Sequence, residues 1–160
     1  MNRISTFSDK TERTETATKI LGERGEQLAA TFLERKGFRL VAANFIVPVG
    51  RNRRNAIIHA EIDLIAYDKD VLVFIEVKTR TSADFAAPET AVDLRKQRQI
   101  TRAARSYRRI FRLRGSSFRY DVVSVVLPDE KSKPKIKLFK SFWSESKFRK
   151  LRWSNEHFVD

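Results

Sequence analysis

The chain contains no cysteine among its 160 residues. This absence excludes thiol catalysis, zinc sites with cysteine ligands and iron–sulfur clusters, and it fits a reducing compartment. The sequence has no run of about 18 apolar residues that would span a bilayer, and its N-terminal part lacks the apolar core of a secretory signal. We therefore expect a soluble, cytoplasmic protein without membrane contacts.

The sequence also lacks an internal repeat, a glycine-rich phosphate loop and a second domain boundary. Its length suits one domain whose hydrophobic core needs no disulfide or structural metal. We predict a flexible N-terminal segment over residues 1–18, a main domain over residues 19–143 and a C-terminal tail over residues 144–160.

Acidic residues are outnumbered, with 20 Asp and Glu against 33 Lys and Arg and a net charge of +13. The excess favours a polyanionic partner, and the alternatives are a solubilising surface or a membrane-surface patch. Clustering supports the first, because the stretch from Leu94 to Arg114 holds no acid and such a helix repels itself unless an anion lies beside it. The expected nucleic-acid contacts are Arg51, Arg53, Arg54, Arg95, Lys96, Arg98, Arg102, Arg105 and Arg109.

Apolar periodicity and turn residues predict an alternation of helices and strands. The predicted elements are a helix from Ile20 to Lys36, a strand from Phe38 to Phe45, a hairpin of Ile57 to Tyr67 and Val71 to Arg80, a helix that starts at Pro88 or Asp93 and reaches about Leu113, and strands from Phe118 to Leu127 and, at a sheet edge, Lys135 to Trp143. This order is typical of an α/β domain, with a mixed sheet flanked by helices. The long basic helix is expected to be a crossover that packs its apolar side on the sheet.

The predicted hairpin carries acids within apolar strands. Alternate residues of a strand share a face, so Glu76 and Lys78 point one way and Val77 the other. Strands this apolar are expected to be buried, where unpaired carboxylates are costly unless they bind a cation.

The register of the hairpin decides which acids meet. If the hairpin closes with a two-residue turn at 69–70, Asp63 comes opposite Glu76, and Glu61 comes opposite Lys78. A slip by one residue would separate them.

This arrangement suits the hydrolysis of a phosphodiester, which needs an activated water and balance for the charge that develops on phosphorus and the leaving oxygen. Carboxylates that hold Mg²⁺ or Mn²⁺ supply both, and Asp63 and Glu76 are candidate ligands together with the backbone carbonyl of Val77. Lys78 is expected to stay protonated and to orient the attacking water or the phosphate. Glu26, near the core-facing side of the first helix, is a candidate third acid.

Each of these residues also has a structural interpretation. Acid–lysine pairs across exposed strands are common, and Glu26 can be satisfied at the edge of its helix by Arg24 or Lys36. Incidental or packing roles are expected for His59, His157, Tyr107, Trp143 and Trp153, with base stacking as the alternative for the two tryptophans.

A set of short stretches along the chain is specific enough to indicate a family. The stretches are Gly25-Glu26-x-x-Ala29, Phe32-Leu33, Gly37-Phe38, Asn44, Glu61-Ile62-Asp63-Leu64-Ile65, Phe74-Ile75-Glu76-Val77-Lys78-Thr79-Arg80, Lys96, Ala103-Ala104, Tyr107 and Arg119-Tyr120-Asp121-Val122-Val123. From about Gly22 to Phe142 the chain resembles the YraN-like proteins, a widespread bacterial family of uncharacterised function.

The YraN-like proteins are similar to the restriction-endonuclease-like (PD-(D/E)XK) superfamily and, within it, to archaeal Holliday-junction resolvases. The resemblance implies a restriction-endonuclease-like mixed β-sheet flanked by α-helices over residues 19–143. It implies Glu26 as the acid of the N-terminal helix, Asp63 and Glu76 as metal ligands, and Lys78 as the active-site lysine.

The chain departs from the family pattern at two places. It has Ala60 where the family usually has glycine before the Glu-Ile-Asp run. Its connection from Asn44 to Glu61 is longer and carries a basic, turn-prone loop at residues 51–55. Neither departure removes a proposed ligand, but both bear on how a substrate enters.

The leading hypothesis is a Mg²⁺-dependent endonuclease that hydrolyses phosphodiester bonds in structured or branched DNA. A resolvase cuts two strands symmetrically, so a homodimer is expected in that case. The alternative is a DNA- or RNA-binding accessory protein that keeps the endonuclease-like fold without catalysis. A third hypothesis is a basic scaffold that contacts proteins or ribosomes.

Overall fold

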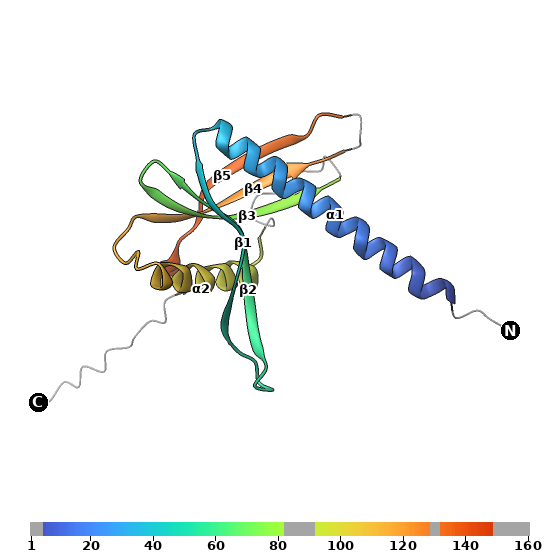
Figure 1. Cartoon of the computed structure of the whole chain (residues 1–160), viewed down its shortest axis with the longest axis horizontal. Coiled ribbons are helices and arrows are strands. Elements are labelled where there is room, and N and C mark those ends of the chain that lie inside the picture. The colour runs from blue at the N-terminus through green and yellow to red at the C-terminus, as the bar shows by residue number, and fades with distance from the viewer. Residues whose placement is uncertain (1–4, 82–91, 129–131, 149–160) are drawn as a thin grey trace, which may run out of the picture.

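The computed structural model describes residues 5–81, 92–128 and 132–148. The elements, drawn in Figure 1, are helix α1 (Ser5–Arg35), strands β1 (Arg39–Arg51), β2 (Ile57–Asp68) and β3 (Val71–Arg80), helix α2 (Leu94–Ile110), strands β4 (Phe118–Val126) and β5 (Lys135–Trp143), and the 3₁₀-helix η2 (Glu145–Phe148). Within these ranges, no helix is long and apolar enough to cross a membrane.

The strands form one mixed sheet in the order β1-β2-β3-β4-β5. β3 and β4 are parallel, and the other neighbouring strands are antiparallel. A parallel pair needs a crossover, and α2 provides it, as predicted for the long basic helix. The prediction of an α/β domain with a mixed sheet flanked by helices is therefore confirmed.

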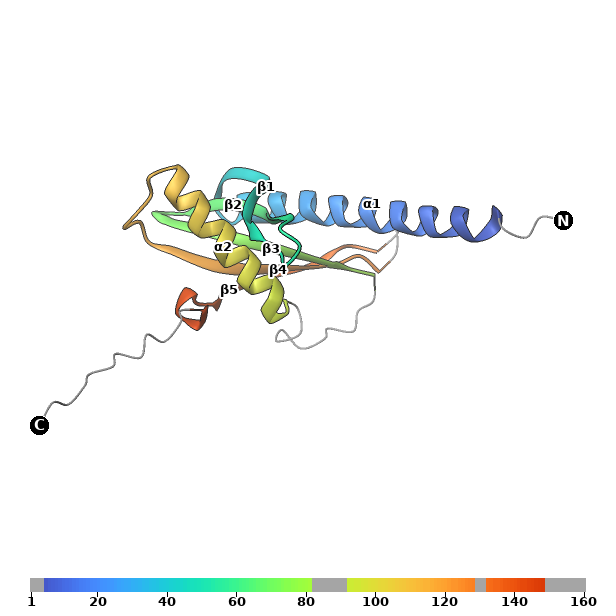
Figure 2. The ribbon, with the colours of Figure 1, turned by 90° about the horizontal axis from the view of Figure 1, so that it is seen from below.

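The two helices cover opposite faces of the sheet (Figure 2). β3 shows this most clearly, because Leu72 and Phe74 lie in the core formed with α2, while Val73 and Ile75 lie in the core formed with α1. All four side chains are completely buried. Burial of each stabilises the fold by about 2 kcal/mol, which explains why this strand is a continuous apolar run.

The apolar side of α2 follows the predicted helical spacing. Ile100, Ala103 and Ala104 are completely buried, and Tyr107 is nearly so. Phe111, four residues after Tyr107, directly follows the last helical residue and is 53% exposed. The helix ends at Ile110, a little before the predicted end near Leu113, and the ring of Phe111 lies against the ring of Tyr107.

The start of α1 differs from the prediction. The helix begins at Ser5, well before Ile20, where apolar spacing first indicates a helix. Residues 14–20 are exposed, and Figure 1 shows this half of the helix extending away from the sheet. A helix that packs on nothing has no apolar side, so the hydrophobic pattern gives no signal there.

The start of α2 distinguishes the two predicted alternatives. Asp93 is the N-cap, and its carboxylate accepts the N–H of Lys96 at 2.7 Å. The other candidate start, Pro88, lies outside the described residues.

β1 ends at Arg51, beyond the predicted end at Phe45. With β2 it forms a long hairpin that projects beyond the rest of the sheet (Figure 1), and we call this hairpin, residues 46–61, the arm. The side-chain oxygen of Asn52 closes the turn by accepting the N–H groups of Arg54 and Ala56, each at 2.9 Å. The predicted basic loop is therefore the tip of the arm.

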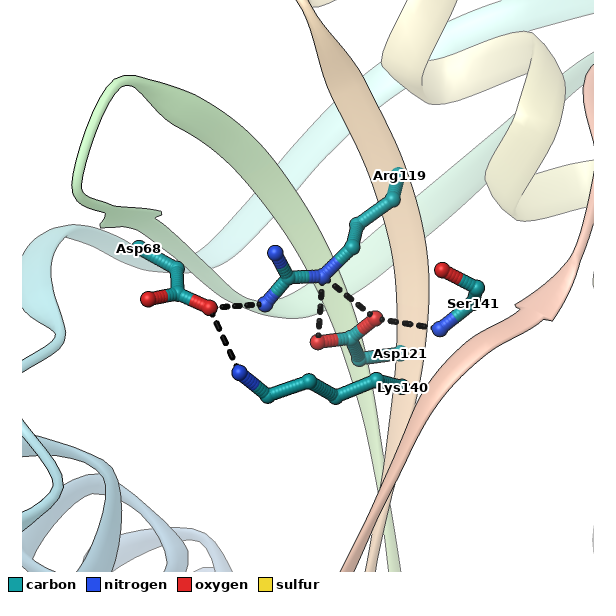
Figure 3. A network of polar contacts seen from close by, with 5 residues as sticks. All are labelled: Asp68, Arg119, Asp121, Lys140 and Ser141. Carbon is teal, nitrogen blue, oxygen red and sulfur yellow. Dashed lines mark hydrogen bonds and ion pairs between the residues drawn. The ribbon is translucent and has the colours of Figure 1, made fainter.

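A polar network ties the β2–β3 turn to β4 and β5 (Figure 3). Arg119 donates to Asp68 at 2.6 Å and to Asp121 at 3.0 Å. Lys140 donates to Asp68 at 2.7 Å, and the N–H of Ser141 donates to Asp121 at 2.9 Å. Burial raises the pKa of Asp121, against the opposite effects of Ser141 and Arg119. Asp121 thus secures β5, the predicted edge strand, where its register on β4 shifts.

Candidate active site

β2 and β3 pair in the predicted register from their turn to Leu64 and Ile75, and the ladder ends there. The next pair in this register, Asp63 with Glu76, was predicted to be part of the ladder, and that prediction is wrong. Instead, Oδ2 of Asp63 accepts the N–H of Val77 at 2.7 Å, in place of a backbone carbonyl. The strands therefore separate at the acids. The N–H and C=O of one residue point to the same side of a strand, so the carbonyl of Val77 also faces Asp63.

The other side of β2 is interrupted at the same residue. Asn44 of β1 and Asp63 face each other in the register but do not pair, and Asn44 has a left-handed φ of 50°. Ile62 lies in the core with α2, whereas Leu64 lies in the core with α1. Residues two apart share a face in a regular strand, so Asp63 lies at a local break in the sheet.

Glu76 is buried between two lysines. Its side chain is 2% exposed, Oε1 lies 2.8 Å from Nζ of Lys78, and Oε2 lies 3.2 Å from Nζ of Lys96. The contact between Glu76 and Lys78 agrees with the predicted shared face. The expected pairing of Lys78 with Glu61 is wrong, because the β2–β3 ladder ends before them, and Glu61 pairs on its other side with Ile46 of β1. Oε2 of Glu76 is buried without a hydrogen-bond partner of regular geometry among the described residues, and it faces the ammonium of Lys96.

The surroundings of Asp63 and Lys96 shift the pKa of each group. Burial, and then the charge of Glu76, raise the pKa of Asp63 to about 7, while Val77 and Lys96 act in the opposite direction. Burial lowers the pKa of Lys96, but the charges of Glu76 and Asp63 outweigh it, and the pKa is raised. Two carboxylates in one buried place repel each other, so an added cation would stabilise both in the ionised form.

Glu26 lies on α1 beside a small pocket. Gly25 lets the helix come this close to β3, because a Cβ at that position would collide with the side chain of Thr79. Burial, and then the charge of Glu61, raise the pKa of Glu26, and a hydrogen bond with Asn44 lowers it. Its partner is therefore on β1, not on its own helix. The pocket has a volume of about 280 Å³ and is lined by Glu23, Glu26, Gln27, Ala30, Ala43, Asn44 and Leu64.

The donor set suits Mg²⁺ or Mn²⁺. In the part of the chain that the structure describes, no group of three or more Asp, Glu and His side chains is assembled for a metal. Mg²⁺, however, is often bound by one or two carboxylates and keeps several waters. Asp63, Oε2 of Glu76 and the carbonyl of Val77 supply such oxygens, and Oε2 has no hydrogen bond to lose.

Lys96 belongs to this site, although the acid-free stretch suggested only a nucleic-acid contact. The helical spacing of the sequence could have predicted this position. Lys96 precedes Ile100, Ala103 and Tyr107 at the spacing that places all of them on one side of a helix. A lysine on the sheet-facing side of a helix needs an acid opposite it, and that acid is Glu76.

Some of the expected nucleic-acid contacts are engaged within the protein. Arg105 bonds to Glu145 of η2, and Arg98 lies over the ring of Phe148, 5.6 Å from its centroid. Arg51 donates to the backbone across the turn of the arm at 2.7 Å. These arginines are exposed, but each is already held by a neighbour.

The other basic residues form an exposed surface on α2 and the arm. The guanidinium of Arg102 lies beside Gly50, where a Cβ would fall 3.1 Å from Nη2, so the helix and the arm are in contact. The exposed arginines of this surface are Arg53, Arg54, Arg95, Arg102 and Arg109.

Three of the residues with expected packing or incidental roles, Tyr107, His59 and Trp143, are among the described residues. Tyr107 is in the core, and His59 is exposed on the arm. Trp143 is 6% exposed, donates to Oγ1 of Thr101 at 3.0 Å and stacks on Tyr120, so the packing interpretation is confirmed for it. Trp153 and His157 lie outside the described residues.

Comparison with known proteins identifies similar sequences. The family model described as "Uncharacterised protein family UPF0102" matches residues 25–125. A UPF0102 protein of Chlorobium limicola is 39% identical over 132 residues, which cover 79% of this chain and 94% of the relative. UPF0102 proteins of Caldanaerobacter subterraneus (39% over 113 residues) and Chlorobium phaeobacteroides (42% over 109 residues) cover 71% and 68% of the chain and 84% and 79% of the relatives, respectively. None of these names states an activity.

Proposed function

The chain belongs to the uncharacterised protein family UPF0102, the YraN-like family that its sequence resembles, and we propose that it is a metal-dependent endonuclease. One observation carries the proposal. The carboxylate of Glu76 is buried between Lys78 and Lys96, beside Asp63, where β2 and β3 separate. Such a cluster of buried charges costs stability, and functional sites are where such clusters are most often found.

In the proposed reaction a water attacks a phosphodiester, and a bound Mg²⁺ or Mn²⁺ supplies the activation of that water and the charge that balances the developing oxyanion. Asp63, Glu76 and the carbonyl of Val77 would hold the ion. Lys78 keeps Glu76 in position through the 2.8 Å contact, and its ammonium would orient the water or the phosphate. Glu26, at the pocket beside Asn44, would assist by receiving a proton.

DNA with branches or other structure is the proposed substrate. The exposed arginines of α2 and the arm suit phosphate contacts, which position a nucleic acid without reading its sequence. A four-way junction has two symmetry-related strands to cut, so a homodimer is proposed for that substrate.

A second function has its own supporting observation. Both oxygens of Glu76 already face ammonium groups, and no third carboxylate or histidine completes a metal cluster in the described ranges. These facts favour an accessory protein that binds DNA or RNA through the same basic surface without cutting it. Such a protein would bind in a salt-sensitive manner whether or not Glu76 is present.

The test is cleavage of labelled linear, single-stranded, flapped and four-way-junction DNA, and of matched RNA, in Mg²⁺, Mn²⁺ and EDTA. Glu76→Gln removes the buried charge, and Asp70→Asn, on the exposed turn of the same hairpin, removes one charge away from the site. An endonuclease gives metal-dependent products with wild type and with Asp70→Asn, and none with Glu76→Gln. Tight binding without product in any metal would reject the enzyme in favour of the accessory protein.

A further inference from the structure

Lys96 reaches the acids from a different element than the rest of the site. Asp63, Glu76 and Lys78 lie on the adjacent strands β2 and β3, whereas Lys96 lies in the first turn of α2, with its backbone held by Asp93. Its side chain is 31% exposed, and the charges of Glu76, Asp63 and also Glu61 act on it. The ammonium of Lys96 is therefore attracted by all three of these acids.

The two lysines hold Glu76 unequally. Lys78 is two residues away on the same strand and lies 2.8 Å from Oε1. Lys96 lies 3.2 Å from Oε2, and this buried oxygen accepts no hydrogen bond within the described part of the chain. A buried carboxylate oxygen without a hydrogen bond has a lone pair available, and the longer contact is the easier one to exchange.

We propose that the ammonium of Lys96 is the resident counter-cation of this site, and that a divalent cation must displace it from Oε2 of Glu76 in order to bind. This rests on the proposed function only in taking Asp63 and Glu76 as the metal ligands. Lys96 thereby stabilises the buried carboxylates in the metal-free protein, and it weakens metal binding by the strength of its own contact.

If Lys96 competes with the metal ion for Glu76, removal of its positive charge should strengthen metal binding. Removal of the charge in Lys96→Gln should tighten Mn²⁺ binding about tenfold, the factor that one charge-assisted contact of ordinary strength represents. Lys96→Arg keeps the charge and should stay near wild type. Arg95→Gln removes the same charge from the neighbouring position, which is exposed, and measures the general effect of net charge.

The experiment is titration of the full chain with Mn²⁺, followed by calorimetry and by the electron paramagnetic resonance signal of free Mn²⁺, at one pH and ionic strength. Addition of Asp63→Asn to Lys96→Gln should abolish the tightened binding if the ion occupies this site. Thermal unfolding checks that each variant is folded, and Lys96→Met replaces Lys96→Gln if that variant is not.

The expected result is tighter binding for Lys96→Gln than for wild type, Lys96→Arg and Arg95→Gln. The proposal is overturned if Lys96→Gln binds Mn²⁺ no more tightly than Arg95→Gln, more weakly than wild type, or not at all. Cleavage is not the readout, so the two proposals fail separately. Tighter binding without nuclease activity leaves this inference standing, and nuclease activity with unchanged binding rejects it alone.

Discussion

Asp63→Asn should stabilise the protein above neutral pH. Burial and Glu76 raise the pKa of Asp63 from 3.8 to about 7 in the folded chain. The folded state therefore holds a proton that the unfolded state has released, and stability falls as the pH rises from the unfolded pKa to the folded one. An asparagine cannot ionise, so the variant escapes this loss, and its side-chain oxygen is still able to accept the N–H of Val77.

The magnitude follows from the shift. One pKa unit corresponds to about 1.4 kcal/mol, so a shift from 3.8 to about 7 makes ionised Asp63 cost on the order of 4 kcal/mol. Repulsion by the charge of Glu76 is part of this cost, and burial is the larger part. We expect Asp63→Asn to raise the free energy of unfolding by about 2 to 4 kcal/mol at about pH 8, or Tm by about 6 to 12 °C.

The assay is thermal unfolding, followed by circular dichroism in EDTA, across the range from about pH 4 to about pH 8. The difference in Tm between Asp63→Asn and wild type should increase with pH across this range and become constant above about pH 7. Asp70→Asn, an exposed acid of the same hairpin, is the control and should give no such trend. A difference in Tm that is independent of pH, or a variant less stable than wild type at about pH 8, would show that the ionised carboxylate of Asp63 does not destabilise the fold.

Three further predictions concern the site and its surroundings. Glu76→Gln should lower the free energy of unfolding by about 2 kcal/mol in urea titrations without metal, because it leaves Lys78 and Lys96 without their partner, and a stabilised variant would contradict the ion pairs. Gly25→Ala should destabilise the protein by about 1 to 3 kcal/mol despite its better helix propensity, and Thr79→Ala, which removes Oγ1 and Cγ2 but keeps Cβ 2.8 Å from the new methyl group, should recover part of the loss in a double-mutant cycle; additive effects would disprove the contact. The logarithm of nucleic-acid affinity should fall linearly with that of salt concentration, and replacement of Arg53 and Arg54 by Gln should reduce the slope by about 2, as measured by fluorescence anisotropy; an unchanged slope would exclude the tip of the arm.

The sheet was predictable from sequence where burial imposes a pattern. The run from Val71 to Ile75 indicated a buried strand, and the apolar side of α2 indicated the crossover that packs on the sheet. The first half of α1 was missed because residues 14–20 are exposed and carry no periodic apolar signal. The end of β1 was missed for another reason. Val47 and Val49 pack on the core formed with α2, but Pro48 and Gly50 between and after them are residues typical of loops.

The site was predictable only in part. The shared face of Glu76 and Lys78 follows from the two-residue period of a strand. The separation of the strands depends on Asp63 bonding to a backbone N–H and on the left-handed conformation of Asn44. Neither has a periodic signature, so the ladder was expected to continue through the acids. The helical spacing of Lys96 predicts that it faces the sheet. It was assigned to the nucleic-acid surface because it lies in a stretch of basic residues.

The most direct test of the account combines stability with cleavage in one variant. Asp63→Asn and wild type are compared in Mg²⁺ under single-turnover conditions, on the DNA substrate that wild type cuts, with binding of that DNA verified for both. We expect Asp63→Asn to unfold at a higher temperature and to bind DNA as wild type does, yet to cleave at least about a hundredfold more slowly, because the charges of the site cost stability and are needed for cleavage. Cleavage at the wild-type rate by the stabilised variant would contradict a catalytic role for Asp63 and for the cluster around Glu76.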